Sequence, residues 1–358
     1  MFKLHRAAAP ALLAAAVLSL AAAPSAFAQP APTPPPAAKA VPAEVWIADT
    51  RRVEFTSKVN GHTYAIDIAY PVAAPPAKGY PVIYVLDGEV YFASVTEAVR
   101  VNGNAPQAIV VGIGYPAEDA AWRAPYLAKY AMPPPNMSAM RAGGMALSIA
   151  RTYDLTTPMD EATLKQMSPP GMKVTTADAG GVDDFLKIIE TEIKPRVDDL
   201  AAEQGLKIDH ADQTLFGHSL GGLAVVEALF TEPNAFRTFV AASPSIWWVN
   251  KAVLAKEAGF AAQVKAGKTT PRILITVGGE EQTAPHLPPS MAAMQAQIEA
   301  QIKMARMVDN ACDLAVRLKA LPGAAGYEVA DCAVFPHQEH GISVWPAIGR
   351  AVAFAFPH

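Results

Sequence analysis

Short runs of almost wholly apolar residues recur along the chain and limit its fold more than any other feature. Such runs occupy Val82–Leu86, Ala108–Ile113 and Arg272–Val277. A strand with one face in water alternates apolar and polar residues, whereas a strand covered on both faces does not need to. The runs therefore predict parallel strands that lie between two layers of helices.

The segments between the runs have helical patterns. Apolar residues from Phe185 to Leu200 recur at helical spacing, and Pro289–Leu321 forms a long amphipathic stretch. The first two β-type runs are half exposed and are joined by Asn60-Gly61, which is a β-hairpin signal. We therefore predict an α/β fold with an eight-stranded, mostly parallel sheet and helices on both faces. The eight runs are Arg52–Val59, Thr63–Tyr70, Val82–Leu86, Ala108–Ile113, Gln213–Phe216, Thr238–Ala242, Arg272–Val277 and Tyr327–Val334.

The amino terminus has the three parts of a secretory signal peptide. Lys3 and Arg6 are basic, Ala11–Ala23 is apolar, and Ala26-Phe27-Ala28 has the small residues of a cleavage site. We expect residues 1–28 to be removed and the mature protein to be periplasmic or secreted. No later stretch has the roughly 20 consecutive apolar residues that a membrane-spanning helix needs, so no stable membrane insertion is expected after cleavage.

Residues 29–44 are rich in proline and predict an extended tether, which leaves residues 45–358 as one large domain. The formal net charge is −4 at pH 7, and the chain has no run of Lys and Arg residues. Proteins that bind nucleic acid need a basic surface to neutralise phosphates. Nucleic acid is therefore not an expected partner.

The chain has two cysteines, Cys312 and Cys332. In an oxidising compartment such a pair predicts one disulfide, and the alternative is two buried thiols that behave as small apolar side chains. Cys312 lies in the long amphipathic stretch and Cys332 in the last β-type run, so a bond would link these two elements.

The sequence "GHSLGG" at Gly217–Gly222 follows a β-type run and precedes a helical pattern. A G-x-S-x-G sequence at a strand-to-helix turn is typical of a nucleophile elbow, in which the serine has strained backbone angles and an exposed hydroxyl. Glycines are needed because side chains would collide where the chain reverses. We expect Ser219 to be a nucleophile, and the alternative is a glycine-rich helix start with Ser219 as the N-cap.

A serine hydroxyl is a weak nucleophile unless a base takes its proton, so an acid and then a histidine should follow along the chain. Glu280 and Glu281 follow the seventh run, and we favour Glu281. His337 and His340 follow the last run, and we favour His340 because the final helical pattern comes next. The alternative for Glu281 is a solvated loop carboxylate, and the alternative for His340 is a surface histidine.

Eight segments carry a resemblance to a known enzyme family. They are "VIYVLDGEVYF" (Val82–Phe92), "VVGIGYP" (Val110–Pro116), "RTYDLTTP" (Arg151–Pro158), "GGVDDFLKIIETEIKPRV" (Gly180–Val197), "LFGHSLGGL" (Leu215–Leu223), "FVAASPSIWWVN" (Phe239–Asn250), "TVGGEEQ" (Thr276–Gln282) and "HGIS" (His340–Ser343). With these segments the chain resembles the esterase family of α/β-hydrolases, which includes enterochelin esterases, S-formylglutathione hydrolases and the antigen 85 mycolyltransferases. It is most similar to the periplasmic siderophore esterases, and the resemblance implies the α/β-hydrolase fold.

The resemblance also bears on the site. In the siderophore-esterase branch the glutamate before the glutamine of "EEQ" occupies the acid position, which favours Glu281, although some members are described as using a Ser-His dyad. An oxyanion hole needs two backbone N–H groups aimed at the developing negative charge. We expect them from Leu220, directly after the nucleophile, and from Glu89, after Asp87-Gly88. The alternative for Asp87-Gly88 is an ordinary turn, and no role is expected for the Glu89 side chain.

Residues 117–150, between "GYP" and "RTYDLT", form a longer insertion than the resemblance leads us to expect, and the lid-like region that begins there extends to about residue 180. Seven of the chain's 12 methionines lie between Met132 and Met172. Methionine side chains adapt to bulky ligands, so we expect a lid-like insertion over the site, and a partly disordered loop is the alternative.

Three further residues are expected to bind the substrate. Trp247 and Trp248 are candidates for the wall of the pocket, and the alternative for at least one of them is a place in the core. Arg151 is expected to bind an anionic part of the substrate, because guanidinium groups bind planar oxyanions through two hydrogen bonds. The alternative is a structural salt bridge, for which Asp154 is one candidate partner.

Together these predictions describe an exported serine esterase with a Ser219–Glu281–His340 triad that hydrolyses a bulky small-molecule ester, such as a siderophore trilactone. No cofactor is expected. The histidine pair of "HQEH" has no evident third ligand, so no metal is expected either. An acyltransferase would use the same residues, and an alternative of a different class is a non-catalytic binding protein on a hydrolase scaffold.

Overall fold

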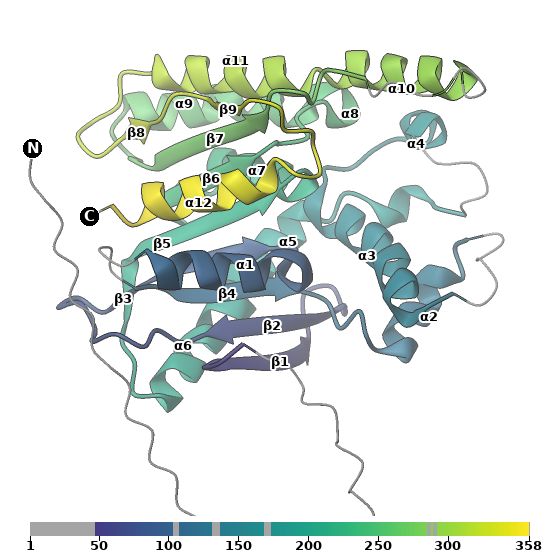
Figure 1. The fold of residues 1–358 in the computed structure, drawn as a ribbon. Coiled ribbons are helices and arrows are strands. Elements are labelled where there is room, and N and C mark those ends of the chain that lie inside the picture. Colours follow the sequence, from purple (N-terminus) through teal and green to yellow (C-terminus); the bar gives the residue numbers. More distant parts are fainter. Residues whose placement is uncertain are drawn as a thin grey trace, which may run out of the picture. The chain divides into compact units, whose positions relative to one another are not determined.

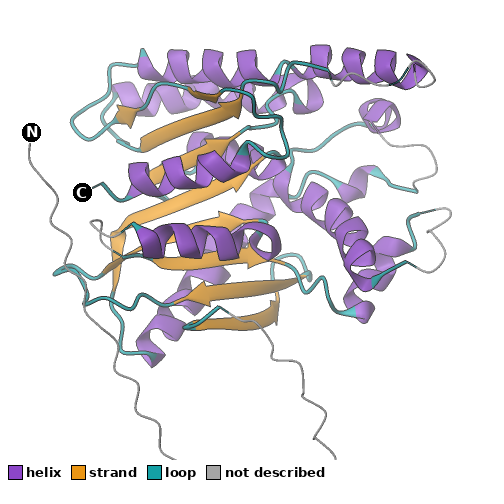
Figure 2. Ribbon diagram, in the orientation of Figure 1, coloured by secondary structure: helices purple, strands orange, loops and turns teal. Residues whose placement is uncertain are grey.

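The computed structural model describes residues 47–102, 107–130, 137–167, 173–284, 288 and 292–357. The expected signal peptide at residues 1–28 and the tether at residues 29–44 lie outside the described residues. Figure 1 shows a layer of strands with helices on both sides, and Figure 2 separates the two kinds of element by colour. The predicted α/β fold is confirmed.

All the described strands belong to one sheet. They are β1 (Thr50–Thr56), β2 (Thr63–Ala69), β3 (Tyr80–Leu86), β4 (Ile109–Gly114), β5 (Ile208–His218), β6 (Thr238–Ala242), β7 (Arg272–Gly278), β8 (Glu328–Val329) and β9 (Ala333–Phe335). Their spatial order is β1-β2-β4-β3-β5-β6-β7-β8, and β9 also pairs with β7. β2 is antiparallel to both β1 and β4, whereas the pairs from β4 onward are parallel. The carboxyl ends of the parallel strands therefore share one edge of the sheet.

The last predicted run, Tyr327–Val334, forms two short strands instead of one. Residues 272 to 276 of β7 face residues 328 to 333 of the edge strand, which is thus one residue longer over this span. One extra residue on one side interrupts a ladder in the manner of a β-bulge. The sheet has nine strands where we predicted eight, because the eighth position is divided between β8 and β9.

Two layers of helices cover the sheet. The helices and helical turns are α1 (Gly88–Val101), α2 (Ala120–Leu127), α3 (Ala139–Leu155), α4 (Glu161–Met167), η1 (Thr176–Asp178), α5 (Val182–Ile188), η2 (Ile189–Ile193), α6 (Lys194–Glu203), α7 (Leu220–Thr231), α8 (Trp248–Lys251), η3 (Ala252–Lys256), α9 (Glu257–Lys265), α10 (Ala292–Ala305), α11 (Met307–Lys319) and α12 (Val344–Ala355). α1 and α12 pack in one apolar cluster, whereas α5, α6, α7, α9 and α11 pack in the other. In Figure 1, α1 and α12 lie in front of the sheet.

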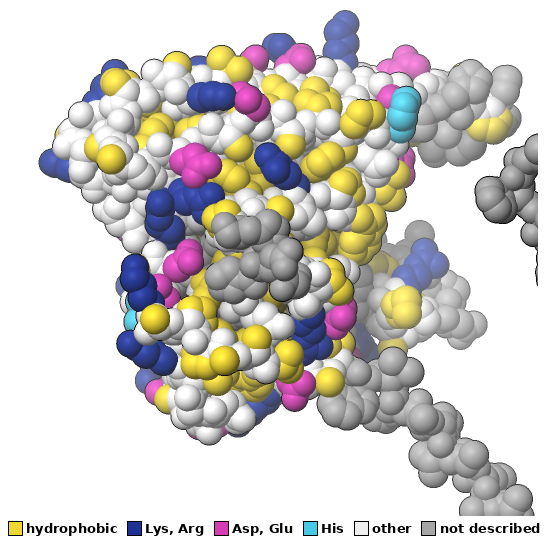
Figure 3. All heavy atoms as spheres, turned by 60° about the vertical axis from the view of Figure 1, so that its left-hand side comes forward, with side chains coloured by type: hydrophobic (Ala, Val, Ile, Leu, Met, Phe, Trp, Pro, Cys, Tyr) yellow, Lys and Arg dark blue, Asp and Glu magenta, His cyan; other side chains and the backbone are white. Residues whose placement is uncertain are grey.

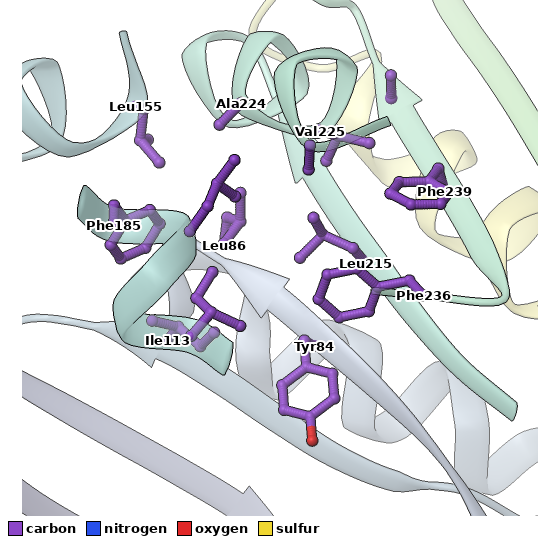
Figure 4. Close-up of a cluster of buried hydrophobic side chains, with 14 of the residues drawn as sticks. Tyr84, Leu86, Ile113, Leu155, Phe185, Leu215, Ala224, Val225, Phe236 and Phe239 are labelled. Carbon is purple, nitrogen blue, oxygen red and sulfur yellow. The ribbon is translucent and has the colours of Figure 1, made fainter. Parts of the chain in front are cut away.

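β3 shows why a strand that is covered on both faces is apolar. All seven of its residues are buried. Ile83 and Val85 belong to the cluster under α1 and α12, while Tyr84 and Leu86 belong to the opposite cluster. Figure 4 shows Tyr84 and Leu86 among side chains of β4, β5, α5 and α7. Each fully buried side chain of this size contributes about 1.5–3 kcal/mol, so both faces of the strand stabilise the fold.

The long amphipathic stretch Pro289–Leu321 is divided. α10 ends at Ala305 and α11 begins at Met307, with Arg306 between them at φ 44°. A residue with positive φ cannot continue a right-handed helix, so the two helices are separate elements. Residues 289 to 291 lie outside the described residues.

The insertion at residues 117–180 contains α2, α3, α4 and η1 within its described parts. The second half of α3 is part of the core, since Ile149, Ala150 and Leu155 are buried. Residues 131–136 and 168–172 lie outside the described residues. The role of the insertion as a lid stays a prediction.

A disulfide joins Cys312 of α11 to Cys332, which directly precedes β9, with the Cα atoms 5.2 Å apart.

Reduction of this disulfide is expected to lower the free energy of unfolding by roughly 3 kcal/mol, because the bond restricts the unfolded chain. A Cys312→Ala/Cys332→Ala variant should show the same loss in thermal unfolding, and reductant should not change its melting temperature. Two titratable thiols in native protein from an oxidising compartment would contradict the bond.

Candidate active site

The turn from β5 to α7 consists of Ser219 alone. Its backbone angles are φ 61° and ψ −118°, a strained combination for a residue with a side chain. A Cβ at Gly217 would lie 2.3 Å from the carbonyl oxygen of Gly221, and a Cβ at Gly222 would lie 2.7 Å from the carbonyl oxygen at the end of β6. Both positions therefore require glycine, and the turn has the geometry of a nucleophile elbow.

The loops after β7 and β9 bring an acid and a base to Ser219. Nε2 of His340 lies 2.9 Å from Oγ of Ser219, and Nδ1 of His340 lies 2.6 Å from Oε2 of Glu281. The rejected candidates pair with each other instead: Glu280 lies 3.8 Å from His337, whose side chain is 92% exposed. The structure thus brings together Ser219, His340 and Glu281.

The Glu281 carboxylate is fixed on both oxygens. The residue is 6% exposed, and its Oε1 accepts hydrogen bonds from Oγ of Ser243 at 2.5 Å and from the Gly278 amide at 2.7 Å. Burial alone would raise the pKa of this carboxyl, but the hydrogen bond and charge of His340, with the Ser243 and Gly278 donors, outweigh burial and lower it. Glu281 therefore stays ionised beside His340.

Two serines near the acid were not found by sequence reasoning. Ser243 follows β6, and its Oγ lies 2.9 Å from Oγ of Ser343. Ser343 in turn lies 3.0 Å from the backbone oxygen of His340. A serine has no distinctive spacing signal, so only the fold shows that the two side chains meet beside Glu281.

His218, the residue before Ser219, was also not found by sequence reasoning. Its Nε2 lies 3.1 Å from the backbone oxygen of His340, and its Nδ1 lies 3.1 Å from the Tyr91 hydroxyl. Burial, followed by the nearby His340, lowers the pKa of His218 to about 4. The ring is therefore neutral at physiological pH.

The two expected oxyanion donors are both at helix starts. Leu220 is the first residue of α7, and Glu89 is the second residue of α1. The first amides of a helix have no intrahelical acceptor and carry its positive dipole end, which favours a developing oxyanion. A Cβ at Gly88 would lie 2.6 Å from the backbone of Gly112 in β4, so this glycine permits close packing of the α1 start on the sheet.

Arg151 forms a salt bridge, and its partner is not Asp154. Its guanidinium donates to both oxygens of Asp87, at 2.7 Å and 2.8 Å. Asp154 is fully buried and accepts from the hydroxyls of Tyr64 and Tyr115 instead. The alternative of a structural salt bridge is thus borne out, but with Asp87 in place of the suggested Asp154, because α3 directs Arg151 and Asp154 to different partners. Arg151 thus anchors the turn from β3 to α1.

The Glu89 side chain, for which no role was expected, occupies an unusual environment. Its Oε2 is buried without a hydrogen-bond partner. Burial, followed by the negative charge of Asp87, raises the pKa of Glu89 to about 8, and this outweighs the lowering effect of backbone N–H groups of Glu89 and Tyr115 and of the Arg151 charge. Glu89 is therefore mostly protonated at pH 7.

This raised pKa leads to a prediction for the pH dependence of activity. Ionisation of Glu89 above about pH 8 places a negative charge beside an expected oxyanion donor, so kcat/KM should fall above that pH. Glu89→Gln keeps the size of the side chain and cannot ionise, so its pH profile should stay flat there. A wild-type profile without an alkaline decline, or a decline retained in Glu89→Gln, would contradict this assignment.

The two tryptophans have different surroundings. Trp248 is buried, and its indole N–H donates to the backbone oxygen of Thr157 at 3.2 Å. Trp247 is half-buried, with its ring centroid 5.9 Å from that of Trp248. Trp248 therefore fills the core, which was the alternative stated for at least one of the two tryptophans. A place for Trp247 in the pocket wall stays a proposal.

The described residues offer neither a metal site nor a membrane span. No group of three or more His, Cys, Asp or Glu side chains is placed to hold a metal ion. None of the described helices is both long and apolar enough to span a bilayer. On the face drawn in Figure 3, acidic and basic side chains are interspersed among the described residues.

Known proteins support the family resemblance. The family model described as "Putative esterase" matches residues 155–313. The chain is 34% identical over 307 residues to ferri-bacillibactin esterase BesA of Bacillus subtilis, covering 84% of this chain and 87% of that protein. It is 27% identical over 301 residues to the siderophore enterobactin esterase of Emericella nidulans, covering 81% and 88%.

A solved structure agrees with these relatives. The crystal structure of the BES protein from Bacillus cereus matches with a TM-score of 0.63 and 28% identity, over 87% of this chain and 97% of that one. The resemblance noted from the sequence is therefore confirmed. The chain belongs to the esterase family of α/β-hydrolases, is similar to its siderophore esterases, and is an ester-hydrolysing enzyme.

Proposed function

We propose that the chain is an exported serine esterase that works through a Ser219–His340–Glu281 triad. The observation that carries the proposal is the continuous series of hydrogen bonds from Oγ of Ser219 through His340 to Glu281, at 2.9 Å and 2.6 Å. Glu281 holds Nδ1 protonated, which leaves the Nε2 lone pair free to accept the serine proton.

The proposed reaction has two halves. In the first, Nε2 of His340 takes the Ser219 proton while Oγ bonds to the ester carbonyl carbon. The amides of Leu220 and Glu89 bind the resulting oxyanion, and the leaving alcohol takes the proton from His340. In the second, His340 takes a proton from water, the water oxygen bonds to the acyl carbon, and the proton returns to Oγ as the acyl group leaves.

The proposed substrate is a bulky ester or lactone such as a catecholate siderophore. The names of the similar proteins, a ferri-bacillibactin esterase and an enterobactin esterase, support this class. Arg151, held by Asp87, is proposed to contact an anionic part of the substrate, and Trp247 to contact an apolar part. Residues 117–180 contain six acidic and six basic residues, so they offer no net attraction for a strongly anionic ferric complex. We therefore favour the metal-free siderophore.

The substrate proposal is tested by kcat/KM values for a trilactone siderophore and for short p-nitrophenyl esters. The trilactone is expected to be the better substrate, and Arg151→Ala should weaken its hydrolysis more than that of p-nitrophenyl acetate. If the short esters are better and Arg151→Ala leaves the trilactone rate unchanged, the siderophore assignment fails while the esterase mechanism stands.

The acyltransferase alternative is tested in the same assay. Hydrolysis predicts free acid as the product even when an acceptor alcohol is added, whereas an acyltransferase would form a new ester.

Export is tested by amino-terminal sequencing of the protein from the periplasm or the culture medium. Cleavage after Ala28 predicts Gln29 as its first residue.

A further inference from the structure

His218 links the nucleophile elbow to the loop of the catalytic base. It is buried at the end of β5, next to Ser219, and its Nε2 lies 3.1 Å from the backbone oxygen of His340. A carbonyl oxygen can only accept, so Nε2 carries the proton and donates. Nδ1 of the neutral ring must then accept, and the Tyr91 hydroxyl at 3.1 Å is its donor. Tyr91 thus fixes the tautomer that His218 needs.

The His340 carbonyl has a second neighbour, the Ser343 hydroxyl, which also contacts Ser243. Oγ of Ser343 lies 3.0 Å from this oxygen and 2.9 Å from Oγ of Ser243. The Ser243 proton is used on Glu281, so the single Ser343 proton must serve both remaining contacts. His218 is therefore the donor whose proton is committed to the His340 carbonyl.

The base loop is the segment that carries His340, residues 335–343, from the end of β9 to the start of α12. Most hydrogen bonds that it forms with other loops lead to the loop of Glu281, not to Ser219. Gly279 and Glu280 donate backbone hydrogen bonds to Phe335 and Gln338, which tie the base loop to the loop of Glu281. Among the described residues, two hydrogen bonds join the base loop to the elbow: His340 Nε2 with Ser219 Oγ, and His218 Nε2 with the His340 carbonyl.

One of these two bonds is lost during the reaction. When Oγ of Ser219 is esterified it has no proton to share, so its hydrogen bond to Nε2 of His340 no longer forms. The His218 bond does not involve the reacting atoms and persists. It is then the direct link that keeps His340 near the acyl carbon, where a water molecule must be activated.

We infer that His218 is a positioning residue that holds His340 in place over the acyl-enzyme and so acts mainly in deacylation. The inference rests on the proposed serine esterase mechanism. In the deacylation step, Nε2 of His340 takes a proton from water as the water oxygen bonds to the acyl carbon. The C–Oγ bond then breaks and the same proton passes to Oγ.

The test compares His218→Leu with His218→Gln in pre-steady-state hydrolysis of p-nitrophenyl acetate. Leucine fills the space but donates nothing, whereas the glutamine amide can donate from nearly the position of Nε2. In His218→Leu the deacylation rate constant should fall at least about tenfold, with kcat and KM falling together and kcat/KM changing less. A burst of about one nitrophenol per enzyme should report the accumulated acyl-enzyme. His218→Gln should recover most of the deacylation rate.

His210→Leu is the matched control, because it makes the same substitution in the same strand on a side chain that is 64% exposed. Its kinetics should match those of the wild type. Tyr91→Phe removes only the hydroxyl that selects the His218 tautomer, and it should slow deacylation by about threefold. If His218→Leu fails to fold, the Gln and Phe variants decide the question.

Two results would overturn the inference. One is a deacylation rate constant in His218→Leu, or in Tyr91→Phe if the former does not fold, equal to that of the wild type. The other is an equal loss of acylation and deacylation in His218→Leu without recovery in His218→Gln. Failure of the proposed function would look different, because the wild type would then form no acyl-enzyme with any ester.

Discussion

Replacing Ser219 with alanine is expected to lower kcat for ester hydrolysis by about 10⁴- to 10⁶-fold, because the members of a triad act as a unit. Without Oγ, the proton acceptor His340 and the expected oxyanion donors have no nucleophile to assist. The fold should survive, since alanine also carries a Cβ and meets the same backbone angles, φ 61° and ψ −118°, as the native serine. An unchanged melting temperature should therefore accompany the loss of activity.

Kinetics with p-nitrophenyl acetate and labelling with a fluorophosphonate measure this result. The wild type should carry one phosphonyl group on Ser219, and the variant should carry none. Ser148→Ala, on the exposed side of α3, is the control for serine removal and should keep full activity. An active Ser219→Ala enzyme would overturn the proposed mechanism.

Local signals explain why much of the fold could be predicted from the sequence. A strand buried on both faces must be apolar throughout, so β3, β4 and β7 could be located to within a few residues. The division of the last run depends on one extra residue in the pairing with β7. The break at Arg306 depends on a left-handed backbone conformation in a helical pattern. Neither feature changes the apolar pattern, so the sequence carried no signal for them.

The candidate site divides in the same way. Ser219 lies in a local motif, and Glu281 and His340 follow strand ends, so their positions could be predicted from chain order. His218 lies within the motif, but its partner, the His340 carbonyl, is 122 residues away along the chain. The Asp87–Arg151 pair spans 64 residues. Such contacts depend on side chains from separate elements that meet at one sheet edge, and no sequence spacing encodes them.

Replacing Glu281 with glutamine is expected to lower kcat by about 10²- to 10⁴-fold, less than the loss of Ser219. Two donors, Ser243 and the Gly278 amide, face Oε1, so the glutamine oxygen should take that place. The glutamine NH₂ then faces Nδ1 of His340, where the native carboxylate accepts at 2.6 Å. An NH₂ group can only donate, so Nδ1 must give up its proton. The single proton of the neutral ring is then on Nε2, which can no longer accept a proton from Ser219.

Steady-state kinetics of Glu281→Gln and Glu280→Gln measure this effect of the tautomer. The two substitutions are the same and adjacent, but the Glu280 side chain is 44% exposed and lies beside His337, so Glu280→Gln should retain wild-type kcat. A Glu281→Gln enzyme with more than about a tenth of wild-type kcat would show that Ser219 and His340 suffice as a dyad. That result would require the glutamine to rotate so that its oxygen accepts from Nδ1 of His340 and its NH₂ faces the Gly278 amide, and a crystal structure would show this as a lengthened contact to that amide.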